Sequence, residues 1–365
     1  MVFAGASGFL AKKIGKGRIG PEREPGAMTD LKRNSTSNAS NIAAESAPAE
    51  RGRIDTIDVA RAIALIAMAI YHFAWDLDNF GYVTRGMATS GGWMVFARCI
   101  ASSFLFLVGF SLILAHAKGI RWRPFGIRLA QIIASALAIT VVTMVVTPDS
   151  FVFFGILHHI AFASLAGLLF IRMPWPLTLA LGIVVIVLPL FFRSAALDPA
   201  YLVWIGLNEK APFSNDFVPV FPFFGVALLG IAAGRATVDH QLLRFVRSTD
   251  TYLGPLRWTA VLGRHSLAFY LLHQPILFGL VFLTTFVAPP DPEASFARDC
   301  RQTCLATQDE AFCARYCGCA RDALVADDLL AALMAGGLDE TQRQSVGQIT
   351  ERCSFESFMG SQEAQ

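Results

Sequence analysis

Charged residues are scarce in this 365-residue chain, because Asp, Glu, Lys and Arg together make up only 16% of it. This scarcity argues against a soluble enzyme of two or three domains, in which about a quarter of the residues are charged. The chain also lacks a glycine-rich phosphate loop and a dinucleotide-binding fingerprint, which argues against the common nucleotide-binding folds. Hydrophobic residues reach 54%, including 30 Phe, and this composition predicts a polytopic membrane protein that contacts lipids. The net charge of +2 is uninformative as a total, because the charges are distributed unevenly along the chain. We expect no nucleic-acid partner.

Seven segments are long and apolar enough to cross about 30 Å of hydrocarbon. They cover residues 57–76, 93–116, 125–147, 151–172, 175–193, 217–236 and 259–287. We therefore predict an all-α membrane helix bundle of about seven spans. Lys and Arg gather in the N-terminal tail and in alternate loops, so the positive-inside rule predicts a cytoplasmic N-terminus and a C-terminus on the opposite side of the membrane.

The chain divides into three expected parts. Residues 1–50 lack a sustained apolar period and are predicted to be a disordered cytoplasmic tail. Residues 51–289 form the transmembrane domain. Residues 290–365 form an external, acidic, Cys-rich helical appendage, which is a candidate site for an external protein partner.

The first span carries four ionisable residues, Asp58, Arg61, His72 and Asp76. On a helix all four project within a sector of roughly 60°. A structural interpretation pairs Asp58 with Arg61 at the membrane surface and joins His72 to Asp76 by a buried hydrogen bond. A functional interpretation is a path about 16 Å long, from an anion-binding Arg61 to a base, His72, that Asp76 orients.

Several motifs carry a resemblance to a known family. They are Asp58-x-x-Arg61-x-Ile63-Ala64 with His72 after it, Gly155 to Ala161, Ser214 to Pro222, and Leu262 to Leu267. Over roughly residues 51–287 the chain resembles bacterial relatives of the heparan-alpha-glucosaminide N-acetyltransferase catalytic domain, among the transmembrane acyltransferases. One departure is Ala62, where the family usually has Gly. The resemblance implies transfer of an acetyl or short acyl group from cytoplasmic acetyl-CoA, or another acyl-CoA, to an amino sugar or sugar hydroxyl of an external glycan.

The candidate site residues follow from these motifs and from the expected sidedness. We predict His72, Asp76 and His158 as catalytic, Arg61, Arg128 and Arg264 as donor-binding, and Asp216, Tyr270 and His273 as acceptor-binding residues, and no metal. Each has an ordinary alternative. Arginines at span ends commonly reach lipid headgroups, a buried His commonly bonds a backbone carbonyl, and the polar stripe of Ser266, Tyr270 and His273 beside Pro275 suits interhelical hydrogen bonding as well as a lumen. His116 is expected to be a solvated surface residue.

Six of the seven cysteines follow the last span. Cys300, Cys304, Cys313 and Cys317 have the spacing of two short antiparallel helices joined by Cys304–Cys313 and Cys300–Cys317, which leaves Cys319 for Cys353. Zinc is the competing interpretation, but the tail has no His. Cys99 lies alone in a span and is predicted to be a small buried hydrophobe.

Two other functions remain open at the level of sequence. A proton-coupled transporter or flippase of a polar or glycan substrate would also need intramembrane His and Asp residues. A membrane scaffold would use the Cys-rich tail to bind its external partner.

Overall fold

The computed structural model describes residues 54–116, 119–210, 212–334 and 336–362. Within these ranges the chain is helical and contains no β-sheet, and an isolated bridge joins Phe154 to Phe217. The all-α prediction is therefore confirmed. The predicted disordered tail, residues 1–50, lies outside the described residues.

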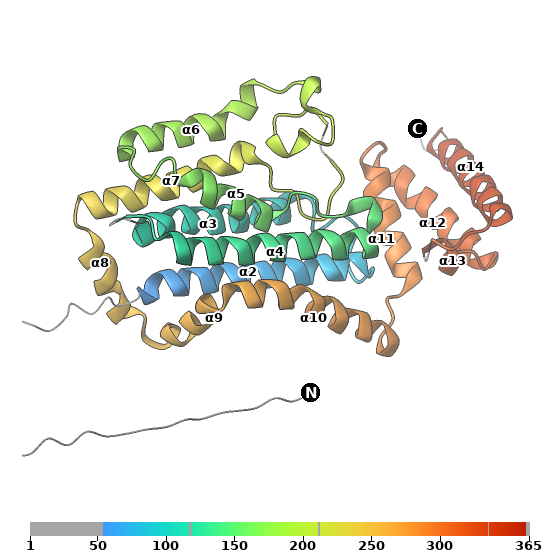
Figure 1. Ribbon diagram of the computed structural model, residues 1–365. Coiled ribbons are helices and arrows are strands. Elements are labelled where there is room, and N and C mark those ends of the chain that lie inside the picture. The colour runs from blue at the N-terminus through green and yellow to red at the C-terminus, as the bar shows by residue number, and fades with distance from the viewer. Residues whose placement is uncertain (1–53, 117–118, 211, 335, 363–365) are drawn as a thin grey trace, which may run out of the picture. The chain divides into compact units, whose positions relative to one another are not determined.

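Five described helices are long and apolar enough to cross a membrane. They are α2 (Asp55–Asn79), α3 (Gly91–His116), α4 (Trp122–Val146), α7 (Val220–Asp239) and α10 (Ser266–Val287). Two shorter apolar helices, α5 (Ile156–Gly167) and α6 (Trp175–Phe191), lie beside them (Figure 1). The short helices α8 (Leu243–Ser248) and α9 (Ala260–Arg264) connect α7 to α10. The chain is a multi-pass membrane protein.

Two predicted spans differ from the observed helices. In the fourth, residues 156–167 alone are α-helical, because Phe154 pairs with Phe217 before them and tighter i→i+3 turns, such as Phe170 N to Gly167 O, follow. The last predicted span is interrupted at His265, between α9 and α10. Pro275 lies inside α10, which extends without a break from Ser266 to Val287.

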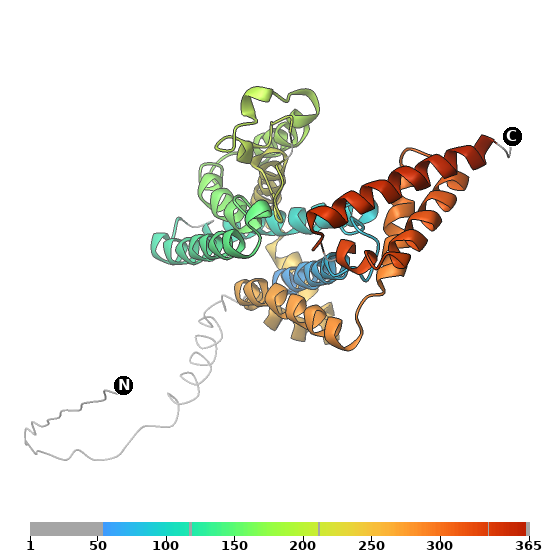
Figure 2. The ribbon, with the colours of Figure 1, turned by 90° about the vertical axis from the view of Figure 1, so that its right-hand side faces the viewer.

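Helix α3 lies at the centre of the membrane core, where it packs against α2, α5 and α7. Figure 2 shows α2 and α10 on one side and α4 and α5 on the other. Small residues allow the closest crossing: Gly109 of α3 lies against the backbone of Ala227, and Gly230 of α7 lies against the carbonyl of Phe106. Such contacts are typical of membrane helices, which gain stability from close packing because lipid is as apolar as the helix surface.

Replacing Gly230 with Val is expected to destabilise the membrane core by about 2 kcal/mol or more, because a Cβ at this position would collide with the Phe106 carbonyl. The matched control is Gly279→Val on α10, where a Cβ would meet no atom within 4 Å. Thermal unfolding in detergent, followed by tryptophan fluorescence, measures both. Equal unfolding temperatures for the two variants would contradict this account of the α3–α7 crossing.

Four helices follow the membrane core. They are α11 (Pro292–Leu305), α12 (Glu310–Ala326), α13 (Leu330–Met334) and α14 (Glu340–Gln362). Disulfides join Cys300 to Cys317, Cys304 to Cys313 and Cys319 to Cys353, which confirms the predicted pairing. Cys99 was predicted wrongly, because its side chain is exposed on α3 among other exposed apolar residues rather than buried within the protein.

Candidate active site

A cluster of opposite charges lies at the N-terminal end of α2. Arg61 donates to Asp58 at 2.9 Å and to the Ser111 hydroxyl at 2.5 Å. Arg264 donates to Asp55 at 3.0 Å, and its Nε lies 3.9 Å from Asp58, whose side chain is only 2% exposed. Buried carboxylates of this kind require partners, because the membrane interior offers no water to solvate them. The cluster therefore fixes Arg61 and Arg264 in position.

Gly263 makes this arrangement possible. Its backbone lies directly against Asp58, and a Cβ at position 263 would collide with the Asp58 carbonyl. The close approach brings α9 against α2 and places Arg264, the next residue, within reach of both carboxylates. The motif from Leu262 to Leu267 therefore supplies two features, a glycine that permits close packing of α9 on α2 and an arginine that pairs with the carboxylates.

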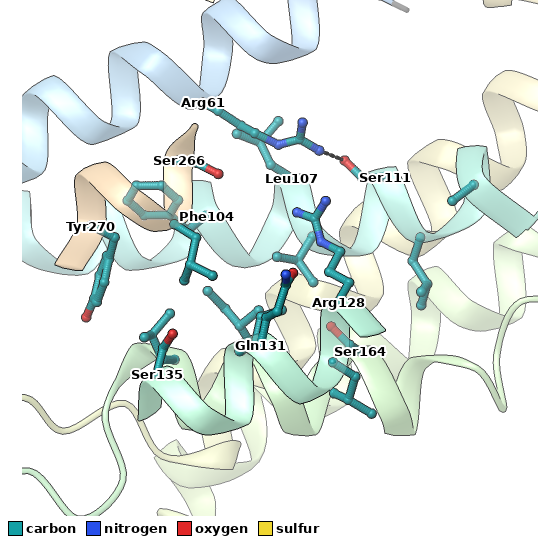
Figure 3. Close-up of a pocket in the computed structure, with 18 of the residues that line it drawn as sticks. Arg61, Phe104, Leu107, Ser111, Arg128, Gln131, Ser135, Ser164, Ser266 and Tyr270 are labelled. Atoms are coloured by element: carbon teal, nitrogen blue, oxygen red, sulfur yellow. Dashed lines mark hydrogen bonds between the residues drawn. The ribbon is translucent and has the colours of Figure 1, made fainter. Parts of the chain in front are cut away.

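A cavity of about 820 Å³ lies beside this cluster, among α2, α3, α4, α5 and the α9–α10 junction. Its polar lining comprises Arg61, Ser111, His116, Arg121, Arg128, Gln131, Ser135, Ser164, Arg264, His265, Ser266 and Tyr270. In Figure 3 Arg61 and Arg128 approach one another from α2 and α4, and Gln131 and Ser135 follow along α4. The volume falls within the usual range for sites that enclose a small-molecule ligand.

The cavity is polar at one end and apolar at the other. The arginines belong to the start of α2, the start of α4 and the end of α9, which all lie at one end of the bundle. Farther along the same helices the lining is largely apolar, with Leu65, Phe104 and Leu157 near Tyr270, and Figure 3 shows Ser135 and Ser266 as uncharged polar side chains on the same side. A ligand with an anionic head and a less polar tail fits this gradient.

Two of the cavity arginines have no carboxylate partner among the described residues. Within the described part of the chain Arg121 and Arg128 form no ion pair, whereas Arg61 and Arg264 bind carboxylates. His116, predicted to be a solvated surface residue, is instead only 8% exposed, and its Nδ1 lies 2.9 Å from the Leu112 carbonyl. His116 also lines the cavity, and its Nε2 is not used in this hydrogen bond. Guanidinium groups without a carboxylate partner are suited to binding a phosphorylated ligand.

His72 and His273 face one another beyond the apolar end of the cavity. Their ring centroids are 5.1 Å apart, and the Tyr270 ring lies 5.8 Å from His273. His273 Nδ1 lies 2.8 Å from the Tyr270 carbonyl, and its Nε2 is buried without a partner. Tyr270 thus lines the cavity on one side and contacts the histidine pair on the other.

Asp76 lies one helical turn beyond His72 and is completely buried. It accepts a hydrogen bond from Gln274 at 2.9 Å rather than from His72, so the predicted orienting pair is not formed. Asp76 Oδ2 and Gln274 Oε1 are both buried and have no hydrogen-bond partner among the described residues. Buried polar atoms without partners are costly, and they concentrate at functional sites.

Asp216 caps the start of α5. Its Oδ2 accepts from the Ile156 amide at 2.8 Å, and a Cβ on Gly155 would collide with this carboxylate. Its surroundings, on the loop before α7, raise the pKa of Asp216 to about 6 by removing water from the carboxylate, although the Ile156 hydrogen bond lowers it. Asp216 Oδ1 has no hydrogen-bond partner within the described ranges.

The adjacent histidines of α5 have different surroundings. His158 Nδ1 accepts from the Gly155 amide at 3.3 Å, and its Nε2 lies 3.2 Å from the Thr140 hydroxyl, so both ring nitrogens are engaged. His159 is fully buried, with Nδ1 2.9 Å from the Val218 carbonyl. The contacts of His158 hold its ring between Gly155 and Thr140, whereas the Nε2 of His159 is buried without a hydrogen-bond partner in the described ranges.

The predicted residues thus fall into three places. Arg61, Arg128, Arg264 and Tyr270 line the cavity, His72, Asp76 and His273 lie beyond its apolar end, and His158 and Asp216 lie at the start of α5. Sequence reasoning missed His116, Arg121, Gln131 and Ser135 as lining residues. Arg128, Gln131 and Ser135 follow the i, i+3, i+7 spacing of one helix face, and that pattern was a signal available in the sequence.

No group of three His, Cys, Asp or Glu side chains in the described ranges could hold a metal ion.

Comparisons with known proteins give one match. Neither a curated protein nor a solved structure matches the chain. The family model for the catalytic region of heparan-alpha-glucosaminide N-acetyltransferase matches residues 53–275, more than half of the chain, and this range contains α2 to α9, the cavity and the His72–His273 pair. The chain therefore belongs to the heparan-alpha-glucosaminide N-acetyltransferase catalytic family of membrane acetyltransferases.

Proposed function

We propose that this membrane acetyltransferase takes the acetyl group of acetyl-CoA, bound in the arginine-lined cavity, and transfers it to an amino sugar or sugar hydroxyl of a glycan at the His72 end. The observation that carries this proposal is the cavity itself. It begins at the guanidinium groups of Arg121 and Arg128, which form no ion pair within the described ranges, and ends at Tyr270. Tyr270 contacts His273, which in turn contacts His72.

The donor lies with its phosphates at the polar end. Arg121 and Arg128 bind them through charge-assisted hydrogen bonds, and Arg61 and Arg264 add positive potential that Asp55 and Asp58 partly neutralise. The thioester then points toward Tyr270, where the lining is apolar. This orientation leaves about 16 Å of α2 between Arg61 and His72, a length that the extended part of the donor must cover.

His72 acts on the transferred group. As a base, it takes the proton that the acceptor nitrogen or oxygen loses on attacking the thioester carbonyl, and gives it to the departing thiolate sulfur as the carbon–sulfur bond breaks. As a nucleophile, its ring nitrogen attacks the thioester carbonyl and the thiolate leaves, taking up the proton that the ring loses. The acceptor then attacks the acetyl-imidazole, the nitrogen–carbon bond to His72 breaks, and the proton of the acceptor returns to the ring. His273 supports the His72 ring from the adjoining helix in either case.

The acceptor approaches from the opposite side of the membrane. Asp216 Oδ1 and His273 Nε2 are the polar atoms proposed to contact it, since neither has a partner within the described chain. The basic loops at the arginine end support a cytoplasmic position for that end, with the C-terminal appendage in the periplasm of a bacterial inner membrane. In this orientation the appendage lies on the same side of the membrane as the glycan, where an external protein partner could bind it.

Purified protein in detergent, given radiolabelled acetyl-CoA and glucosamine-containing oligosaccharides, tests the proposal. Labelled oligosaccharide should accumulate in proportion to enzyme, and acid and base stability of the label distinguishes N-acetyl from O-acetyl products. A transporter or flippase would leave acetyl-CoA intact in this assay and, in a separate uptake assay, would move oligosaccharide into protein-containing liposomes. That result would overturn the proposal.

A further inference from the structure

The loop between α2 and α3 connects the catalytic helix to the appendage. It begins directly after Asn79, the last residue of α2. The Phe80 amide donates to the Asp76 carbonyl at 2.9 Å, and the Tyr82 amide donates to the Leu77 carbonyl at 2.9 Å. The loop backbone is therefore bonded to the last turns of α2, where Asp76 lies one turn beyond His72.

The first appendage helix, α11, binds this loop at Gly81. The Ser295 hydroxyl donates to the Gly81 carbonyl at 2.9 Å, and Arg298 donates to the same oxygen at 3.3 Å and to Ser295 Oγ at 3.1 Å. Ser295 is only 4% exposed, so its hydroxyl is buried against the loop. A buried hydroxyl without that acceptor would be costly, which makes this contact specific.

A second contact on α11 holds the loop four residues farther along. Asp299 Oδ1 accepts from the Arg85 backbone amide at 2.9 Å, and Asp299 Oδ2 lies 3.5 Å from Arg85 Nε. Asp78, on α2, accepts from the Gly86 and Ala88 amides at 3.0 and 2.9 Å. The loop thus lies between a carboxylate of the catalytic helix and a carboxylate of the appendage.

Disulfides fix the helix that makes these contacts. Cys300, the residue after Asp299, is joined to Cys317 of α12, and Cys304 is joined to Cys313. Two covalent links between α11 and α12 limit the orientations available to Ser295 and Asp299. Reduction removes this constraint without altering any residue of the membrane core.

We propose that α11 is a positioning element of the enzyme, which holds the His72 end of α2 and the adjoining loop for the acceptor through Ser295 and Asp299. This inference rests on the proposed function. The affected end is the acceptor end, because Asp76 is fifteen residues, about 22 Å, from Arg61 along α2. Donor binding in the arginine-lined cavity is therefore independent of these contacts.

The test compares full-length variants in the oligosaccharide acetylation assay, with KM measured separately for acceptor and donor. Asp299→Ala and Ser295→Ala should each raise the acceptor KM by roughly three- to tenfold, with the acetyl-CoA KM unchanged. Asp299→Asn, which keeps an oxygen for the Arg85 amide, should recover part of the loss. Dithiothreitol should impose the same acceptor defect on the wild type and add little to Asp299→Ala.

Asp322→Ala is the matched control, since Asp322 is an exposed appendage carboxylate that bonds, within the described ranges, only to its neighbour Arg321. It should retain wild-type constants. If the wild type is active, an unchanged acceptor KM in the Ser295 and Asp299 variants would overturn the positioning role. An equal rise in the acceptor KM and the acetyl-CoA KM, together with a lower unfolding temperature, would also overturn it. Absence of transfer in the wild type would instead overturn the proposed function.

Discussion

Replacing His72 with Gln is expected to lower acetyl transfer by at least about a hundredfold, because an amide neither accepts a proton near neutral pH nor carries an acetyl group. Gln keeps a similar length and hydrogen-bonding capacity, so the contact with His273 changes little. Expression and the unfolding temperature should therefore remain close to those of the wild type. Initial rates of label transfer from acetyl-CoA to oligosaccharide measure the effect.

His240→Gln provides the matched control. His240 is an exposed histidine at the end of α7, and it should tolerate the same substitution without loss of activity. Turnover near the wild-type value in His72→Gln would transfer the chemical role to His273, whose ring is the nearest imidazole to His72 and whose Nε2 has no partner.

Replacing Arg128 with Ala is expected to raise the KM for acetyl-CoA by about tenfold or more, because a charge-assisted hydrogen bond to phosphate contributes about 1.5–3 kcal/mol. The unfolding temperature should not change, since Arg128 has no ion pair within the described residues. Arg128→Lys should recover part of the affinity, because an ammonium group retains the charge but not the two-pronged geometry.

Arg61→Ala should behave differently from Arg128→Ala. Removing Arg61 takes the 2.9 Å ion pair away from the buried Asp58 carboxylate, so this variant should lose stability by about 3 kcal/mol as well as donor affinity. The exposed Arg244 of α8 provides an Ala control that should leave both properties intact. An unchanged KM for acetyl-CoA in Arg128→Ala would show that the cavity is not the donor site.

Much of the fold could be predicted from local patterns. Hydropathy located a helix in each of the seven predicted segments, because a chain in lipid must satisfy its own backbone hydrogen bonds. The i, i+4 spacing of Cys300 with Cys304 and of Cys313 with Cys317 fixed the disulfide pairing, because such pairs share one helix face. The pairing of Asp58 with Arg61 followed from the same helical geometry.

Contacts between distant segments could not be predicted in this way. The fourth span is shortened by Asp216 and Phe217, sixty residues farther along, which hold the chain before Ile156 in an extended form. Asp76 binds Gln274 rather than the nearby His72 because α10 packs against α2 at that level. Hydropathy marks Cys99 as apolar, but it cannot distinguish a lipid-facing surface from a protein interior.

The central claim is that the acetyl group enters at the arginine end of the bundle and leaves at the His72 end. Its most direct test uses proteoliposomes in which impermeant labelled acetyl-CoA and a glucosamine oligosaccharide are confined to opposite sides of the membrane. The account predicts labelled oligosaccharide in the compartment that held no acetyl-CoA, and none with His72→Gln. Product formed only when donor and acceptor share one compartment would contradict it.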